Sequence, residues 1–333
     1  MIASAPPSVD ERLLSPRSVR LLLWVGLALL LALFHASRVE FGGAADQLER
    51  HERILAGAGQ SPWGYRVLSP LLAEVAAAPL EAAGLPRSAA VRGAYVASRF
   101  AWTLALLVLF RRYLAHWFAS PWPLAGTLLL AALHPPSFAW YWFAPDSPLD
   151  LAIWAAVAVA TVERHDRWLL PLVLLGALNR ETVVFAAGVH AALRYGEEPW
   201  PRLARRTAAL LLAWAVPFVG LRLLLGPLEW SGGGTVGRYL AANFGGPSWP
   251  AWAAALWGVA WILPLLTWRS LPRPWRRLLL VFVPYVLLQF LFGRIREVRL
   301  FLPLALVLVP VLLRGLGAAV RRPGICGPLR ELV

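Results

Sequence analysis

Long apolar segments recur along most of the 333-residue chain, and they constrain its fold more than any other feature. A helix that spans a membrane needs about 20 mostly apolar residues. Runs of this character begin at residue 21 and continue, separated by polar stretches, to residue 313. Charged residues make up only 15% of the chain, whereas soluble domains usually carry about 25%. The sequence therefore predicts an all-α fold, a polytopic transmembrane helical bundle over residues 1–333, rather than a soluble helical core.

Arginines indicate how these segments are oriented. All 32 basic residues are arginines, and basic residues gather in loops on the cytoplasmic side of a membrane. We therefore expect about ten membrane segments with both termini in the cytoplasm. The layout has a cytoplasmic N-terminus (1–20), a long first external loop with juxtamembrane helices (38–88) and a basic cytoplasmic tail (314–333). Residues 21–36 are interpreted as a retained first span rather than a signal peptide, because many spans follow them.

The net charge of +14 fits cytoplasmic loops beside anionic lipid. Membrane lipids, and not nucleic acid, are therefore the expected partners, since no recognition motif for DNA or RNA occurs in the sequence. The single cysteine, Cys326, leaves no intrachain disulfide and no cysteine-based metal site.

Residues 168–194 allow two interpretations. Two short apolar runs, 169–178 and 182–193, flank Asn179, Arg180 and Glu181. At about 1.5 Å per residue, each run reaches roughly 15–18 Å, about half of a hydrocarbon core of about 30 Å. The segment is either a hairpin with its polar tip deep in the protein or one long helix with a buried arginine–glutamate pair. We favour the hairpin, because a single span would move the basic residues of 194–206 to the outside.

Ionisable residues interrupt the apolar pattern in four places, and such residues at membrane depth are functional by default. In chain order the four clusters are Asp46 with His51; Tyr65 with Arg66; Asp146 with Asp150; and Asn179, Arg180 and Glu181 with Arg294, Arg296, Glu297 and Arg299. Three of the four clusters also have a structural interpretation: a solvated loop carboxylate for Asp46, a helix-terminus anchor for Arg66, and salt bridges for Arg180–Glu181 and Arg296–Glu297.

Together these side chains suit one kind of reaction. A carboxylate takes a proton from an acceptor hydroxyl as a general base. Arginines bind a phosphate in a bidentate way and stabilise it as a leaving group. An apolar groove between helices accommodates a lipid tail. The sequence therefore favours a sugar donor linked to a lipid phosphate, and the serine-hydrolase, zinc-protease and kinase motifs are absent from it.

On these residues the chain resembles the GT-C-type polytopic membrane glycosyltransferases, which use polyprenyl-phosphate sugars. Members of that superfamily have an acidic residue soon after the first span and a Tyr-Arg-x-Leu-x-Pro-like stretch before a juxtamembrane helix. Asp46 is similar to the first feature, and residues 65–70 (Tyr-Arg-Val-Leu-Ser-Pro) are similar to the second. Asp146 looks like the second acidic position, and residues 179–181 look like the basic-acidic turn of many relatives.

The resemblance implies a role for each group. Asp46 would activate the acceptor hydroxyl, and Asp146 and Glu181 would orient substrate or support the arginines. The implied substrate-binding residues are Arg66, Tyr65, His51, Asp146, Arg180, Glu181, Arg294, Arg296, Glu297 and Arg299, with Arg66, Arg294, Arg296 and Arg299 on the donor phosphate. The sugar would pass with inversion from a polyprenyl-phosphate-linked donor to a glycan, lipid or protein acceptor on the outer face of the bacterial inner membrane. The sequence indicates no certain cofactor beyond the polyprenyl-phosphate-linked donor. A divalent cation could sit between Asp46 and Asp146, but nothing in the spacing demands one.

Two other functions use the same residues. A transporter or flippase of a lipid-linked or anionic substrate would use the arginines without bond chemistry. A non-catalytic membrane scaffold would use the arginine–glutamate pairs only to hold helices together.

Overall fold

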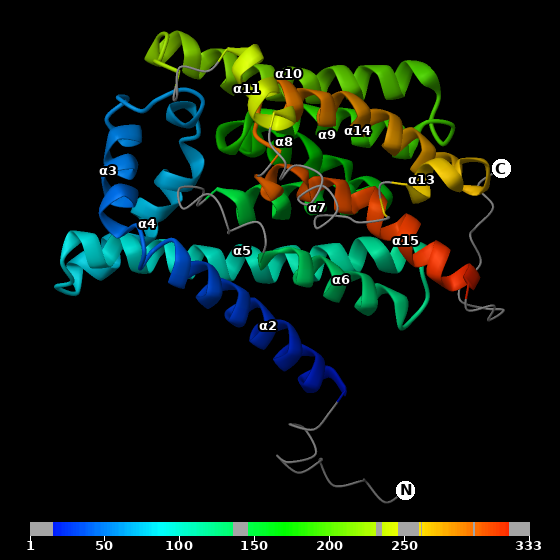
Figure 1. Ribbon diagram of the computed structural model, residues 1–333, viewed down its shortest axis with the longest axis horizontal. Helices are drawn as coiled ribbons and strands as arrows, with labels where there is room; N and C mark the ends of the chain where they lie inside the picture. Colours follow the sequence, from blue (N-terminus) through cyan, green and yellow to red (C-terminus); the bar gives the residue numbers. More distant parts are fainter. Residues whose placement is uncertain are drawn as a thin grey trace, which may run out of the picture.

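A computed structural model describes residues 16–135, 146–230, 235–245, 260, 262–295 and 297–319. These residues form helices joined by turns, and no strand longer than an isolated bridge occurs among them. Figure 1 shows the helices packed into one elongated bundle, with α2 (Pro16–Arg38) projecting from it. The predicted all-α class is therefore confirmed for the part of the chain that the structure describes.

Five of the described helices are long and apolar enough to cross a membrane. They are α2, α5 (Arg87–Trp117), α10 (Trp200–Leu225), α14 (Arg273–Phe292) and the run Val298–Gly317, which joins η7 (Val298–Leu304) to α15 (Ala305–Ala319). Two shorter apolar helices are α6 (Trp122–Leu133) and α7 (Ser147–Val162). The layout of ten segments stays a prediction, and residues 252–259 and 261 of the apolar run at 252–268 lie outside the described residues.

Two helices extend beyond the limits that their charged residues suggested. Helix α5 continues through Arg111 and Arg112 to Trp117, although the apolar run in the sequence ends at Phe110. Helix α10 begins at Trp200, before the arginines of 202–206. Arginine is a good helix former, so a charged residue ends an apolar run in the sequence without ending the helix.

Helix α7 forms the centre of the bundle and is buried along nearly its whole length. It packs against α5, α8 (Leu169–Asn179) and α9 (Phe185–Arg194), and Figure 1 shows it between α5 and the α8–α9 pair. Its many alanines let the neighbouring backbones approach closely. Its Trp154 ring lies 6.0 Å from Phe282 and 5.8 Å from Tyr285 of α14.

Two helices lie within residues 38–88, and the placement of this segment as an external loop stays a prediction. They are α3 (Ala44–Leu55) and α4 (Leu68–Ala82), separated by the short helix η1 (Trp63–Tyr65). His51 of α3 bonds through its two ring nitrogens to Tyr95 of α5 (2.8 Å) and Glu74 of α4 (2.5 Å). This buried imidazole therefore ties both loop helices to the bundle.

The segment 168–194 is a hairpin, as favoured from the sequence. Arg180 has an extended backbone (φ −159°, ψ 132°) that separates α8 from η4 (Glu181–Val184) and α9. Arg206 of α10 contacts Asp166 before α8 and Glu198 after α9, each at 2.7 Å. A continuous helix of this length would hold its ends about 39 Å apart. The single-span alternative is therefore wrong.

The same end of the bundle collects other residues predicted to be cytoplasmic. Arg112 pairs with Glu163 at 2.5 Å, and Arg164 pairs with Glu197 at 3.3 Å. These pairs connect α5, the turn after α7 and the end of the hairpin. Which face of a membrane this end meets stays a prediction.

Close packing at the hairpin provides a test of the fold. A Cβ added at Gly176 of α8 would lie 2.7 Å from a Val183 methyl carbon and 3.2 Å from an Ile153 methyl carbon. We expect Gly176→Ala to destabilise the purified protein by about 1–3 kcal/mol, measured by thermal unfolding in detergent. Gly220→Ala is the matched control, because nothing lies within 4 Å of that position on α10. Equal unfolding temperatures for the two variants would contradict this packing.

Candidate functional site

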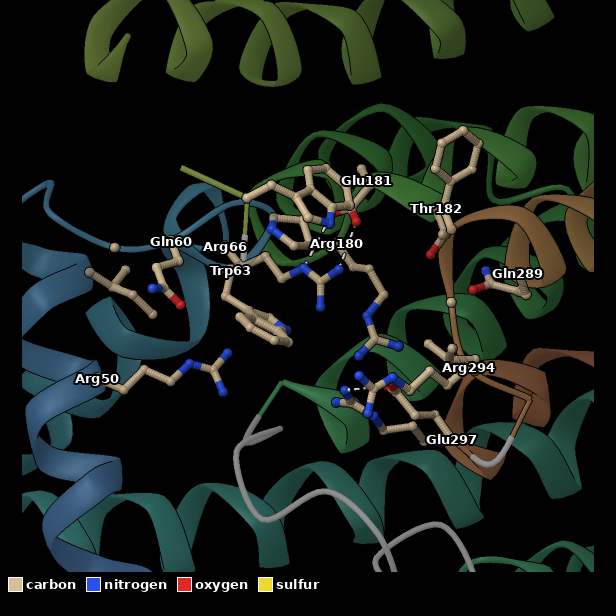
Figure 2. Close-up of a pocket in the computed structure, with 18 of the residues that line it drawn as sticks. Arg50, Gln60, Trp63, Arg66, Arg180, Glu181, Thr182, Gln289, Arg294 and Glu297 are labelled. Carbon is tan, nitrogen blue, oxygen red and sulfur yellow. Dashed lines mark hydrogen bonds and ion pairs between the residues drawn. The ribbon is translucent and has the colours of Figure 1, made fainter. Parts of the chain in front are cut away.

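A cavity of about 700 Å³ lies beside the C-terminal part of α10, and Arg206 lies near the other end of this helix. Its walls come from α3, η1, the hairpin tip, the C-terminal part of α10, α11 (Val236–Phe244) and the turn after α14. Figure 2 shows side chains from these segments converging on it. Seven of the residues predicted for the site line it: Asp46, Arg66, Arg180, Glu181, Arg294, Glu297 and Arg299.

The other predicted residues lie beside this cavity. Asp146 and His51 line an adjoining space of about 10 Å³, roughly the volume of one water molecule. Tyr65 supports the wall, because its hydroxyl donates to the Gly226 carbonyl at 2.8 Å and accepts from the Leu228 amide at 3.1 Å. Arg296 lies outside the described residues.

A buried ion network forms the floor of the cavity. Asp146 accepts from Arg180 at 2.8 Å and from Arg66 at 3.4 Å. Arg180 also reaches Asp150 at 3.3 Å, and Arg66 binds Glu181 at 2.6 Å. Burial alone would raise the pKa of the Asp146 carboxyl, but the positive charges of Arg180 and Arg66 outweigh burial and lower it. Asp146 is therefore ionised and stabilises both arginines.

Local hydrogen bonds fix the hairpin tip above this network. The Asn179 side-chain amide donates to the Asp146 carbonyl at 3.2 Å, and the Trp214 indole donates to the Glu181 carbonyl at 2.8 Å. The extended backbone at Arg180 turns its side chain toward the carboxylates at the start of α7. These hydrogen bonds therefore fix the hairpin tip relative to the start of α7 and to α10.

Asn243 of α11 holds the turn that follows α14. Its side-chain amide donates to the Phe290 and Gly293 carbonyls, both at 2.9 Å, and its oxygen accepts from the Ile295 amide at 2.8 Å. On the same turn, Arg299 pairs with Glu297 at 2.8 Å and lies 4.0 Å from Asp146. The sequence analysis missed Asn243, because its partners lie about 50 residues away.

Arg50 is a second residue that sequence reasoning did not select. Its guanidinium carbon lies 5.1 Å from the centre of the Trp63 ring, and Figure 2 shows the side chain directed into the cavity. Burial lowers the pKa of Arg50 to about 10, so the group still carries its charge at neutral pH. The sequence could have indicated this residue, because Arg50 follows Asp46 by four residues and residues at i and i+4 share one helix face.

The polar groups of the site do not suit a metal ion. Among the described residues, no group of three or more His, Cys, Asp or Glu side chains is arranged to hold one. A divalent cation between Asp46 and Asp146 would meet Arg66, Arg180 and Arg299 around the second carboxylate. These positive charges disfavour a cation there.

The chain matches no protein-family model, no curated protein and no solved structure. The resemblance to the GT-C superfamily therefore stays an expectation.

The buried network leads to a stability prediction. Arg180→Gln leaves Asp146 and Asp150 without their closest cation, and breaking a buried pair typically costs about 3–5 kcal/mol. We expect a corresponding loss of stability in thermal unfolding. Arg53→Gln is the control, because its pair with Glu49 is exposed and 3.5 Å long and such pairs contribute about 1 kcal/mol or less. A stable Arg180→Gln variant would show that the network does not support the fold.

Proposed function

We propose that the protein is a membrane glycosyltransferase that moves a sugar from a polyprenyl-phosphate donor to an acceptor hydroxyl on the outer face of the bacterial inner membrane. The observation that carries this proposal is that Asp46 has no cationic partner among the described residues. Four acidic residues line the cavity, and three of them, Glu49, Glu181 and Glu297, contact Arg53, Arg66 and Arg299 respectively. The Asp46 side chain is exposed in the first turn of α3, and it makes no ion pair or hydrogen bond with any residue that the structure describes. A carboxylate that pairs with no cation keeps its oxygens available to accept a hydrogen bond from an acceptor hydroxyl.

The reaction follows from this placement. A carboxylate oxygen of Asp46 accepts the proton of the acceptor hydroxyl as the hydroxyl oxygen attacks the anomeric carbon of the sugar. The bond between that carbon and the phosphate oxygen breaks on the opposite side, so the configuration inverts. The phosphate leaves with the bonding electrons, and arginines around the cavity stabilise its negative charge.

The walls of the cavity suit a donor that is part lipid. Its volume of about 700 Å³ lies within the usual range for ligand sites of about 300–1,000 Å³. Apolar side chains from α10 and α14, among them Phe218, Leu288 and Phe292, line one part of it. On the outside of the same helices, Leu223, Leu224 and Leu287 are exposed. Helices that carry apolar side chains both in the cavity and on their exposed faces fit a donor with a long hydrocarbon tail.

Transport of a lipid-linked or anionic substrate requires the arginines but not an unpaired carboxylate at Asp46. A scaffold requires neither the cavity nor its unpaired groups. The geometry therefore favours transfer over both alternatives.

The test compares envelope glycans and lipid-linked sugars by mass spectrometry. Cells that lack the protein are complemented with wild type, Asp46→Asn or Glu49→Gln at matched expression. We expect wild type to restore one sugar and Asp46→Asn to lower its transfer by about 10²–10⁴-fold, the usual contribution of general acid–base catalysis. Glu49→Gln is the matched control, because Glu49 lines the same cavity from the same helix and contacts only the exposed Arg53.

Two results would remove the proposal. Full restoration by Asp46→Asn would show that this carboxylate is not the base. If deletion changes no sugar and the purified protein moves lipid-linked substrate across liposomes without a covalent product, the protein is a transporter.

A further inference from the structure

We propose that Arg50, Arg222 and Arg294 form the subsite that binds the phosphate of a lipid-linked ligand. Arg66, Arg180 and Arg299, which also line the cavity, serve instead to neutralise protein carboxylates. The inference deepens the proposed function and rests on it for the lipid nature of the ligand. The assignment of the three binding residues rests on the contacts of the cavity.

Ion pairs separate the arginines of the cavity into two groups. Seven arginines line it: Arg50, Arg53, Arg66, Arg180, Arg222, Arg294 and Arg299. Four of them lie within 4.0 Å of a carboxylate, and these are Arg53, Arg66, Arg180 and Arg299. A guanidinium that already binds a carboxylate has less attraction left for a ligand phosphate. The paired arginines are therefore poor candidates for ligand binding.

Arg50 has the clearest unfilled capacity for an anion. Its Nε and Nη1 atoms are buried, and neither has a hydrogen-bond acceptor among the described residues. The Trp63 ring contacts the guanidinium but cannot satisfy its N–H groups in the way an oxygen does. A buried charged donor without an acceptor is costly, and a phosphate oxygen would remove that cost.

Arg222 approaches the same cavity from α10. Its guanidinium carbon lies 3.6 Å from the Phe218 ring centre and 4.3 Å from the Tyr65 ring centre. Its Nη1 donates to the Phe218 carbonyl at 2.9 Å, and it pairs with no carboxylate in the described part of the chain. The two rings hold the guanidinium plane, while its charge remains available to an anion.

Arg294 completes the subsite on the turn that Asn243 holds. Its side chain is exposed, and it makes no ion pair within the described ranges. Figure 2 shows Arg50 and Arg294 reaching the cavity from opposite sides. Three cations from α3, α10 and this turn thus line one cavity, and a bound anion would reduce the repulsion among them. A phosphate, with several charged oxygens, matches such an arrangement.

The test measures binding directly, without any requirement for catalysis. Farnesyl phosphate, farnesol and inorganic phosphate are titrated by calorimetry into the full-length protein in lipid nanodiscs. Wild type should bind farnesyl phosphate more tightly than either of the other two probes. Arg50→Gln, Arg222→Gln and Arg294→Gln should each weaken that binding by about 10–100-fold, as expected for loss of a hydrogen bond to a charged group.

Two controls separate binding from folding. Arg53→Gln removes an arginine that lines the same cavity but already pairs with Glu49, so its affinity should equal that of wild type. The unliganded Arg50→Gln variant should unfold at the wild-type temperature or above it, because the substitution removes an unsatisfied buried charge. Arg50→Lys should recover part of the lost affinity.

The outcomes distinguish this inference from the proposed function. Wild-type affinity for farnesyl phosphate in the three glutamine variants would overturn the subsite, even if sugar transfer were demonstrated. Equal affinity for inorganic phosphate and farnesyl phosphate would overturn the claim that the ligand is lipid-linked. Weakened binding in the variants, combined with no sugar transfer by wild type, would support the phosphate subsite and overturn the proposed glycosyltransferase activity.

Discussion

The contact between Arg180 and the two aspartates at the start of α7 is the interaction on which the rest of the site depends. Both partners are almost completely buried, with Arg180 1% exposed and Asp146 2% exposed. A guanidinium at such depth requires carboxylates around it, so the hairpin tip must lie against the N-terminal end of α7. Arg66 joins the same network and connects the segment between η1 and α4 to the bundle. The floor of the cavity is therefore set by charge neutralisation rather than by apolar packing alone.

Much of the fold could be predicted from hydropathy, because the length and apolar character of a segment are local properties. The helical class was accessible in this way, and the hairpin at 168–194 was accessible from the basic residues of 194–206, which a single span would move to the outside. The ends of α5 and α10 could not be predicted in this way. Hydropathy indicates where an apolar run begins and ends, but a helix that contains arginines extends beyond that run. The number of membrane crossings also depends on how helices such as α6, with 12 residues, are placed relative to the lipid.

For the candidate site, sequence reasoning predicted which residues would meet but not what each one does. Ionisable groups in a largely apolar chain must find one another, and so Asp46, Arg66, Arg180 and Arg294 share one cavity. Whether an arginine is paired depends on contacts across more than a hundred residues, such as Arg66 with Glu181. Arg222 read as part of an apolar helix, and Arg50 was one of several charges in a polar loop. Which arginines pair with a carboxylate therefore depends on tertiary contacts and could not be predicted from the local sequence.

The order of the buried ion network along the chain has a consequence for synthesis and insertion. Arg66, Asp146 and Asp150 all precede Arg180 in the sequence. An arginine that enters lipid without a counter-ion is expensive, but the carboxylates that receive Arg180 have already left the ribosome when it emerges. The hairpin is short on each side and polar at its tip, so it is poorly suited to insert alone. It can enter instead along the surface of α7, as a late step of assembly guided by a charge already in place.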